Sequence, residues 1–91
     1  KLIYPLNESI LNSVNIVTFQ WEGYDLDGDI KNYDLIIENA SNGTEIKYEK
    51  ILIEELDIEL QNGNVYLWKI ITRDNENNIS TSVTSNFELA N

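Results

Sequence analysis

The stretch Asn64-Val65-Tyr66-Leu67-Trp68-Lys69-Ile70-Ile71-Thr72-Arg73-Asp74 decides the fold of this chain. Its side chains alternate with a period of two, which is typical of a β-strand. One face carries Tyr66, Trp68, Ile70 and Thr72, and the other carries Val65, Leu67, Lys69 and Ile71. Because both faces include apolar residues, we expect a central strand rather than an edge strand. Gly63 lies in a turn signal just before it and can supply a positive φ.

The length and composition predict one globular domain. The chain has 91 residues, of which 42% are hydrophobic, and a chain of this size forms a single hydrophobic core. We expect one domain over residues 1–91, excised from a longer protein because the first residue is Lys1 rather than Met. No apolar run of about 18 residues occurs, so no membrane-spanning helix is expected. The absence of cysteine means that the core depends on packing without disulfides.

The charge balance argues against several classes of partner. The formal net charge is −10, from 16 acidic and 6 basic residues. Binding to nucleic acid or to anionic lipid requires lysine and arginine to neutralise phosphates. We therefore expect no nucleic acid and no direct membrane insertion, whereas the acidic surface favours solubility, cations or a basic partner. The chain also lacks histidine, the commonest general base.

Alternating segments elsewhere predict about seven strands. The segments are residues 1–5, 14–21, 30–38, 44–50, 51–60, 64–74 and 80–89. Pro5 places the first at a sheet edge because proline cannot donate to a ladder, and residues 6–13 are expected to be turn-like. The apolar parity changes between Ile53 and Leu56, which requires a turn or bulge near Glu54-Glu55; a short helix is the alternative.

The spacing of these segments predicts an all-β fold. Turn signals recur every 8–12 residues, as in an antiparallel two-sheet Greek-key sandwich. Within each of three strands, alternate side chains are expected to share a face. The sets are Val17, Phe19 and Trp21; Tyr33, Leu35 and Ile37; and Val83, Phe87 and Leu89. We expect the set of Val17, Phe19 and Trp21 to point inward.

Several short motifs occur in a characteristic order. They are Phe19-Gln20-Trp21, Asp25-x-Asp27-Gly28-Asp29, Ile30-x-x-Tyr33-x-Leu35, Leu60-x-Asn62-Gly63-x-x-Tyr66-x-Trp68-x-Ile70, Arg73-Asp74 and Asn78-x-Ser80. Across nearly the whole chain this pattern resembles a fibronectin type III domain, an immunoglobulin-like sandwich, of the kind found in prokaryotic surface and secreted proteins. The resemblance implies that Trp21 is buried and that Leu60 and Tyr66 form a tyrosine corner. The adhesive Arg-Gly-Asp tripeptide is absent, so integrin-type recognition is not implied.

An acidic loop suggests a metal site. Asp25, Asp27 and Asp29 stand at alternate positions, and we expect Asp74 in a second loop at the same end of the sandwich. Clustered carboxylates suit Ca²⁺, although the spacing is not that of an EF-hand. We therefore hypothesise calcium binding by Asp25, Asp27, Asp29 and Asp74. The alternative is that these residues make Asx-turns and that Gly28 supplies a positive φ.

The outward face of the central strand suggests a partner site. Leu67 and Ile71 would point away from the core, beside Ile36 of the neighbouring strand. An exposed apolar patch of this kind often marks a contact with another protein. The alternative is that these are ordinary surface aliphatic residues covered by long polar side chains.

Four Asn-x-Ser/Thr sequons begin at Asn7, Asn39, Asn42 and Asn78. All four fall in predicted turns, where a glycan would be tolerated in an archaeal or eukaryotic exported protein.

These observations predict a non-catalytic structural or adhesion module of an extracellular or cell-surface protein. Members of the resembled family mostly act as spacers, stalks or docking modules, so partners would be neighbouring domains or a surface protein. No catalytic residue and no cofactor other than Ca²⁺ is expected. The alternative is an accessory carbohydrate-binding module of a secreted hydrolase, for which Tyr24, with Tyr4 or Tyr48, would supply the stacking rings.

Overall fold

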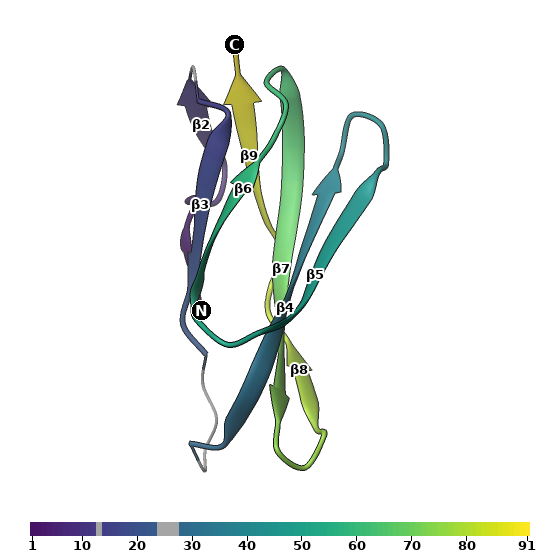
Figure 1. Cartoon of the computed structure of the whole chain (residues 1–91). Coiled ribbons are helices and arrows are strands. Elements are labelled where there is room, and N and C mark those ends of the chain that lie inside the picture. Colours follow the sequence, from purple (N-terminus) through teal and green to yellow (C-terminus); the bar gives the residue numbers. More distant parts are fainter. Residues whose placement is uncertain (13, 24–27) are drawn as a thin grey trace.

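The computed structural model describes residues 1–12, 14–23 and 28–91, which fold as an all-β sandwich of two sheets (Figure 1). The strands are β1 (Leu2–Tyr4), β2 (Ser9–Asn12), β3 (Ile16–Trp21), β4 (Ile30–Asn39), β5 (Glu45–Ile51), β6 (Glu55–Glu59), β7 (Asn64–Asp74), β8 (Ile79–Thr81) and β9 (Ser85–Ala90). The predicted two-sheet sandwich is confirmed, with more strands than the seven expected. None of the described residues forms a helix long and apolar enough to cross a membrane.

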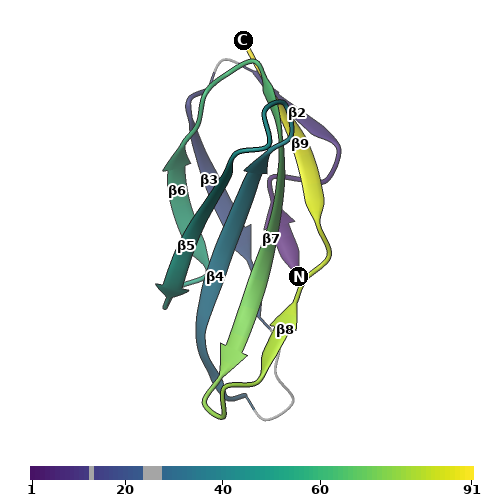
Figure 2. The same cartoon turned by 90° about the vertical axis from the view of Figure 1, so that its right-hand side faces the viewer.

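The two sheets differ in size. The small sheet has the order β1-β3-β6, and the large sheet has the order β2-β9-β7-β4-β5 with β8 beside β7. β7 is central, as predicted, because it pairs with β4 on one side and with β9 and β8 on the other. Figure 2 shows the large sheet from its broad side, with β4 and β7 running along its length.

Alternate residues of the long strands form the core between the sheets. Phe19 of the small sheet meets Trp68 of the large sheet edge to face, with ring centroids 5.1 Å apart at 76°. The inward face predicted for residues 14–21 is confirmed, and the faces predicted to be shared by alternate residues in 30–38 and 64–74 also point into the core. The buried apolar residues are Val17, Phe19, Trp21, Tyr33, Leu35, Ile37, Ile58, Leu60, Tyr66, Trp68, Ile70, Phe87 and Leu89.

The turn between β6 and β7 is closed by a tyrosine corner. The Tyr66 hydroxyl donates to the Gln61 carbonyl oxygen at 2.8 Å and accepts from the Gln61 amide at 3.2 Å. Gly63 follows with a φ of 83°, in the left-handed region that glycine adopts without strain. The Tyr66 ring therefore anchors both the core and the turn.

Residues 9–12 form a strand, although the sequence predicted that residues 6–13 would be turn-like. They form β2, and β2 runs parallel to β9, so the sandwich is not wholly antiparallel. Leu11 packs against the core whereas Ile10 is 60% exposed. A strand with a single inward apolar residue has no alternation for the sequence to display, and its partner is remote in the chain.

The last predicted strand, residues 80–89, is in fact two strands. Ser82 separates β8 from β9, because its hydroxyl accepts a hydrogen bond from the Ile70 amide at 2.9 Å. The side chain thus replaces a backbone partner and the ladder stops there. Val83, which shares parity with Phe87 and Leu89, is not in the core and is 78% exposed.

The change of parity in residues 51–60 is explained by a change of sheet. β5 belongs to the large sheet and β6 to the small one, so the predicted turn is confirmed and the helical alternative is wrong. Glu54 fixes this crossing, because its carboxylate accepts from the Tyr33 hydroxyl at 2.8 Å and from the Gly23 amide at 2.6 Å.

Replacing Tyr66 with phenylalanine removes both bonds to Gln61 while keeping the buried ring. We expect the free energy of unfolding to fall by about 1–2 kcal/mol, and the melting temperature to fall by about 4–8 °C for each kcal/mol. The matched control is Tyr48→Phe, since the half-buried Tyr48 makes no hydroxyl hydrogen bond to the described residues. Equal melts for both variants would contradict a structural role for the corner.

Candidate functional site

The three predicted partner-binding residues lie on the outer face of the large sheet. Ile36 is on β4, whereas Leu67 and Ile71 are on β7, and all three are half-buried. Charged residues lie opposite two of them in the β4–β7 pair: Lys69 is opposite Ile36, and Asp34 is opposite Ile71. The face is therefore a mixture of aliphatic and charged side chains rather than a continuous apolar patch.

Two of the three residues line a shallow hollow. The hollow measures about 150 Å³, and its walls are Ile36, Glu38, Glu45, Leu67, Trp68, Lys69 and Thr84. Ile36 and Leu67 provide aliphatic lining, and the charged groups come from β4, β5 and β7. Ile71 is not among the lining residues, because it lies on the far side of Lys69 along β7. Ile36 and Leu67 therefore line the same hollow, whereas Ile71 does not line it.

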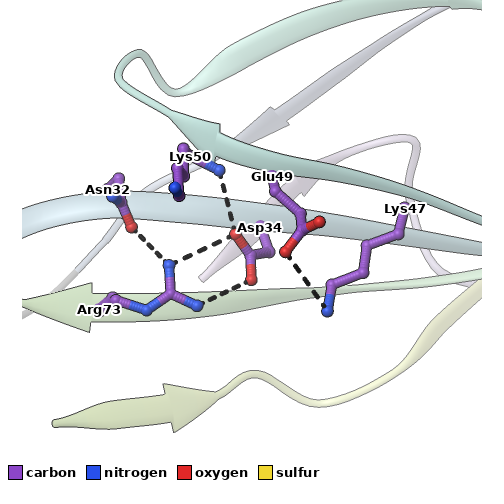
Figure 3. Close-up of polar contacts among 6 residues, drawn as sticks. All are labelled: Asn32, Asp34, Lys47, Glu49, Lys50 and Arg73. Atoms are coloured by element: carbon purple, nitrogen blue, oxygen red, sulfur yellow. Dashed lines mark hydrogen bonds and ion pairs between the residues drawn. The ribbon is translucent and has the colours of Figure 1, made fainter. Parts of the chain in front are cut away.

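A buried carboxylate, which the sequence analysis did not identify, lies next to Ile71. Asp34 is only 1% exposed although it points to the outer face. Its Oδ2 atom lies 3.0 Å from Nη2 of Arg73, the only arginine in the chain. Nη1 of Arg73 also donates to Asn32 Oδ1 at 2.7 Å (Figure 3). The guanidinium group covers the carboxylate and shields it from solvent.

A β-bulge completes the surroundings of Asp34. The pairing of β4 with β5 shifts register between Tyr33 and Leu35, and Lys50 has a φ of 58°. This turns the Lys50 amide toward Asp34, and it donates to Oδ1 at 3.1 Å (Figure 3). Burial alone would raise the pKa of Asp34, but the bonds from Arg73 and Lys50 outweigh it and lower the pKa below 3.8. The carboxylate therefore ties together β4, β5 and β7.

Replacing Asp34 with asparagine should reveal this pair through its pH dependence. We expect a loss of about 2 kcal/mol in the free energy of unfolding at pH 7, because a charged hydrogen-bonded group is removed. Since the folded-state pKa of Asp34 is lowered, its stabilisation is present above about pH 4 and is lost as the pH falls through the folded value. Urea titrations at pH 7, 5 and 3 should show a difference from wild type that shrinks only at pH 3.

The control for this experiment is Glu45→Gln, which removes the same charge from an exposed position. We expect it to change the unfolding free energy by less than about 0.5 kcal/mol at each pH. A difference between wild type and the Asp34 variant that stayed constant down to pH 3 would rule out the assigned protonation behaviour.

Two of the four predicted calcium ligands, Asp29 and Asp74, belong to the described residues. Asp25 and Asp27 lie outside the described residues. Asp29 and Asp74 are brought to the same end of the sandwich, as Ile30 pairs with Asp74 and the Asn75 amide donates to the Asp29 carbonyl at 3.2 Å. The Asn75 side chain also donates to the Asp29 carboxylate.

Asp74 is engaged by its own turn. Its carboxylate accepts from the Asn78 amide at 2.8 Å, from the Glu76 amide at 2.9 Å and from the Asn78 side chain at 3.1 Å. Desolvation opposes its ionisation, but these donors outweigh that effect and lower the pKa of Asp74. Gly28 has a φ of 64°, as the Asx-turn alternative requires. Within residues 1–12, 14–23 and 28–91 no cluster of three or more acidic, histidine or cysteine side chains could hold a metal ion.

The calcium hypothesis predicts a difference between melts in excess EDTA and in millimolar Ca²⁺. A ligand at about a hundred times its Kd adds about 2.7 kcal/mol, which is several degrees in a small domain. The increase should disappear in Asp27→Asn and persist in Glu45→Gln, which removes a charge from the other end of the sandwich. Superimposed melts of the wild-type protein would refute the hypothesis.

The remaining candidates from the sequence are dispersed. Tyr24 is outside the described residues, whereas Tyr4 belongs to the small sheet and Tyr48 to the large one. Of the sequon residues, Asn7 and Asn42 lie in turns, Asn78 lies in the connection between β7 and β8, and Asn39 is the last residue of β4. The side-chain oxygens of Asn39 and Asn42 each accept a hydrogen bond from the backbone amide two residues later in the chain. The side-chain oxygen of Asn7 accepts one from the Asn86 amide.

The outer face of β6 was not among the sites predicted from the sequence. Glu55, Asp57 and Glu59 are exposed there in a row. Their signal in the sequence was the strict alternation of acidic and aliphatic residues in Glu55-Leu56-Asp57-Ile58-Glu59.

The chain was compared with known proteins. No family model matches the sequence, and no curated protein matches it significantly.

Proposed function

We propose that this chain is a non-catalytic, fibronectin type III-like module of an extracellular or cell-surface protein, and that it serves in spacing, display or protein–protein contact. Two features that the resemblance implied support this assignment. Trp21 is 2% exposed within β3, and the Tyr66 hydroxyl bonds to Gln61 in the turn before β7. The dimensions of 42 × 21 × 19 Å describe an elongated body, which suits a spacer.

The observation that carries the contact role is the hollow on the outer face of the large sheet. Ile36 and Leu67 form an aliphatic centre, and Glu38, Glu45 and Lys69 surround it with charge. Protein interfaces commonly combine an apolar centre with a polar rim. The neighbouring Asp34–Arg73 pair joins β4, β5 and β7 on this same face, so the surface is presented on interlocked strands.

A photo-crosslinking amino acid placed at position 67 of the parent protein, on intact cells, tests both display and contact. We expect a crosslinked adduct from position 67, since a protein partner would cover the hollow. The matched control is position 52, where Leu52 is 78% exposed in the β5–β6 connection, away from the hollow. Adducts from both positions, or from neither, would count against the contact role.

A further inference from the structure

Within the part of the chain that the structure describes, the edge of the small sheet formed by β6 is regular and unpaired. Among the described residues β6 pairs with β3 alone, and their register runs from Ile16–Glu59 to Gln20–Glu55 without a shift. Figure 2 shows β6 at the side of the sandwich, next to β3. A free strand edge presents backbone donors and acceptors that another extended chain can use.

Two hydrogen bonds establish which backbone groups point outward from β6. The Trp21 amide donates to the Glu54 carbonyl oxygen at 3.1 Å, and the Leu60 amide donates to the Asn15 carbonyl oxygen at 2.8 Å. Bonded positions alternate along an antiparallel pair, so Leu56 and Ile58 direct their amides toward β3. The residues that direct their amide and carbonyl groups to the open edge are therefore Glu55, Asp57 and Glu59.

The same three residues carry a row of carboxylates on the outer face. Alternate residues of a strand are separated by about 6.6 Å. Asp57 is oriented by the Thr18 hydroxyl, which donates to it at 2.6 Å, and Glu55 by the Gln20 side chain at 2.8 Å. The two ion pairs of the described residues, Lys47–Glu49 and Asp34–Arg73, involve none of these carboxylates.

The other long free edge, that of β5, differs in both respects. Its outer side chains have mixed charge, with Lys47 Nζ 3.8 Å from Glu49 Oε2. It is also interrupted by the bulge at Lys50, and bulges reduce the ability of an edge to pair. β6 is thus the edge that combines regular geometry with a single sign of charge.

We infer that the β6 edge binds an extended segment of a partner protein in which lysine or arginine alternates with apolar residues. The segment would add to the small sheet as a further strand. Its backbone would bond to Glu55, Asp57 and Glu59, and its basic side chains would lie opposite their carboxylates. The intervening apolar side chains would lie beside Leu56 and Ile58. This inference rests on the protein-contact role proposed above and names the chemistry of the partner.

A second copy of the chain does not fit this edge. Pairing two β6 strands would bring two rows of carboxylates together, and like charges directly opposite each other destabilise a sheet. The competing interpretation is that the acidic row protects the edge from all pairing. That interpretation predicts that no added strand binds, which separates the two experimentally.

The test is a titration of the ¹⁵N-labelled chain with a capped peptide, acetyl-Thr-Lys-Val-Lys-Val-Lys-Thr-amide. We expect the largest shifts and slowed hydrogen exchange at the amides of residues 55, 57 and 59, because these gain bonds. The amides of Leu56 and Ile58 already donate to β3 and should change less. A peptide with glutamate in place of lysine is the control and should not bind. Absence of binding by the lysine peptide, or shifts away from β6, would overturn the inference.

The charge-reversal variant Asp57→Lys should weaken binding of the lysine peptide by roughly fivefold or more. Glu49→Lys makes the same change of net charge at the β5 edge, outside the hollow, and should alter affinity by less than about twofold. Equal weakening in both would reduce the effect to net charge and overturn the inference. Thermal melts establish that each variant is folded; Glu55→Gln replaces Asp57→Lys if the latter unfolds, with a smaller but still selective loss expected.

Failure of this inference is distinguishable from failure of the contact role. Loss of peptide binding with an adduct still formed at position 67 would remove the β6 edge and leave the hollow. Peptide binding at β6 without that adduct would remove the hollow as a contact surface and leave the edge.

Discussion

The edge-to-face contact between Phe19 and Trp68 is the interaction on which this sandwich depends. It joins the middle strand of the small sheet to the central strand of the large one, with centroids 5.1 Å apart. Phe87 extends the cluster from β9, 5.8 Å from Phe19, and stacks on Tyr66 at 5.6 Å. Because aromatic pairs stabilise beyond the area they bury, this cluster supplies much of the cohesion that disulfides provide in other small domains.

The outer face of the large sheet depends on a different balance of forces. Asp34 is buried there by the side chain of Arg73 rather than by a second layer of structure. A buried charge is tolerated only where partners satisfy it, and the bulge at Lys50 supplies one such partner from the edge strand. The irregularity of β5 is therefore part of what stabilises the pair. The pair also holds together β4 and β7, the two strands that carry the half-buried aliphatic residues of this face.

Much of the fold could be predicted because it depends on the local alternation of inward and outward residues along each strand. Tyr66, Trp68 and Ile70 have the period of two that a half-buried strand requires, and the structure buries all three. The parallel β2–β9 pair could not be predicted, because it depends on residues 9–12 meeting residues 87–90 at the other end of the chain. The division of the last strand at Ser82 arises because the Ser82 hydroxyl, rather than a backbone carbonyl oxygen, accepts from the Ile70 amide. Serine and threonine are common within strands, so their presence in the sequence does not predict such a break.

The candidate sites were less predictable than the fold. The sequence placed Ile36 and Leu67 on one face correctly, since parity decides that, but it gave no indication that Arg73 would cover Asp34. Their pairing requires the register of two strands and a bulge in a third. Likewise, the bonds at Trp21 and Leu60 determine which residues of β6 direct their backbone groups to the open edge. Parity assigns side chains to faces, whereas register determines which backbone groups remain available.

The parallel pair of β2 and β9 has a mechanical consequence. β2 lies near the start of the chain and β9 near its end, and four register positions join them, from Ser9–Phe87 to Asn12–Ala90. Tension applied between the two ends of the chain would pull these strands along their own axes in opposite directions. Their hydrogen bonds would then be loaded together in shear rather than broken one at a time. After the short β1 detaches, the domain should resist extension until this ladder ruptures as a unit.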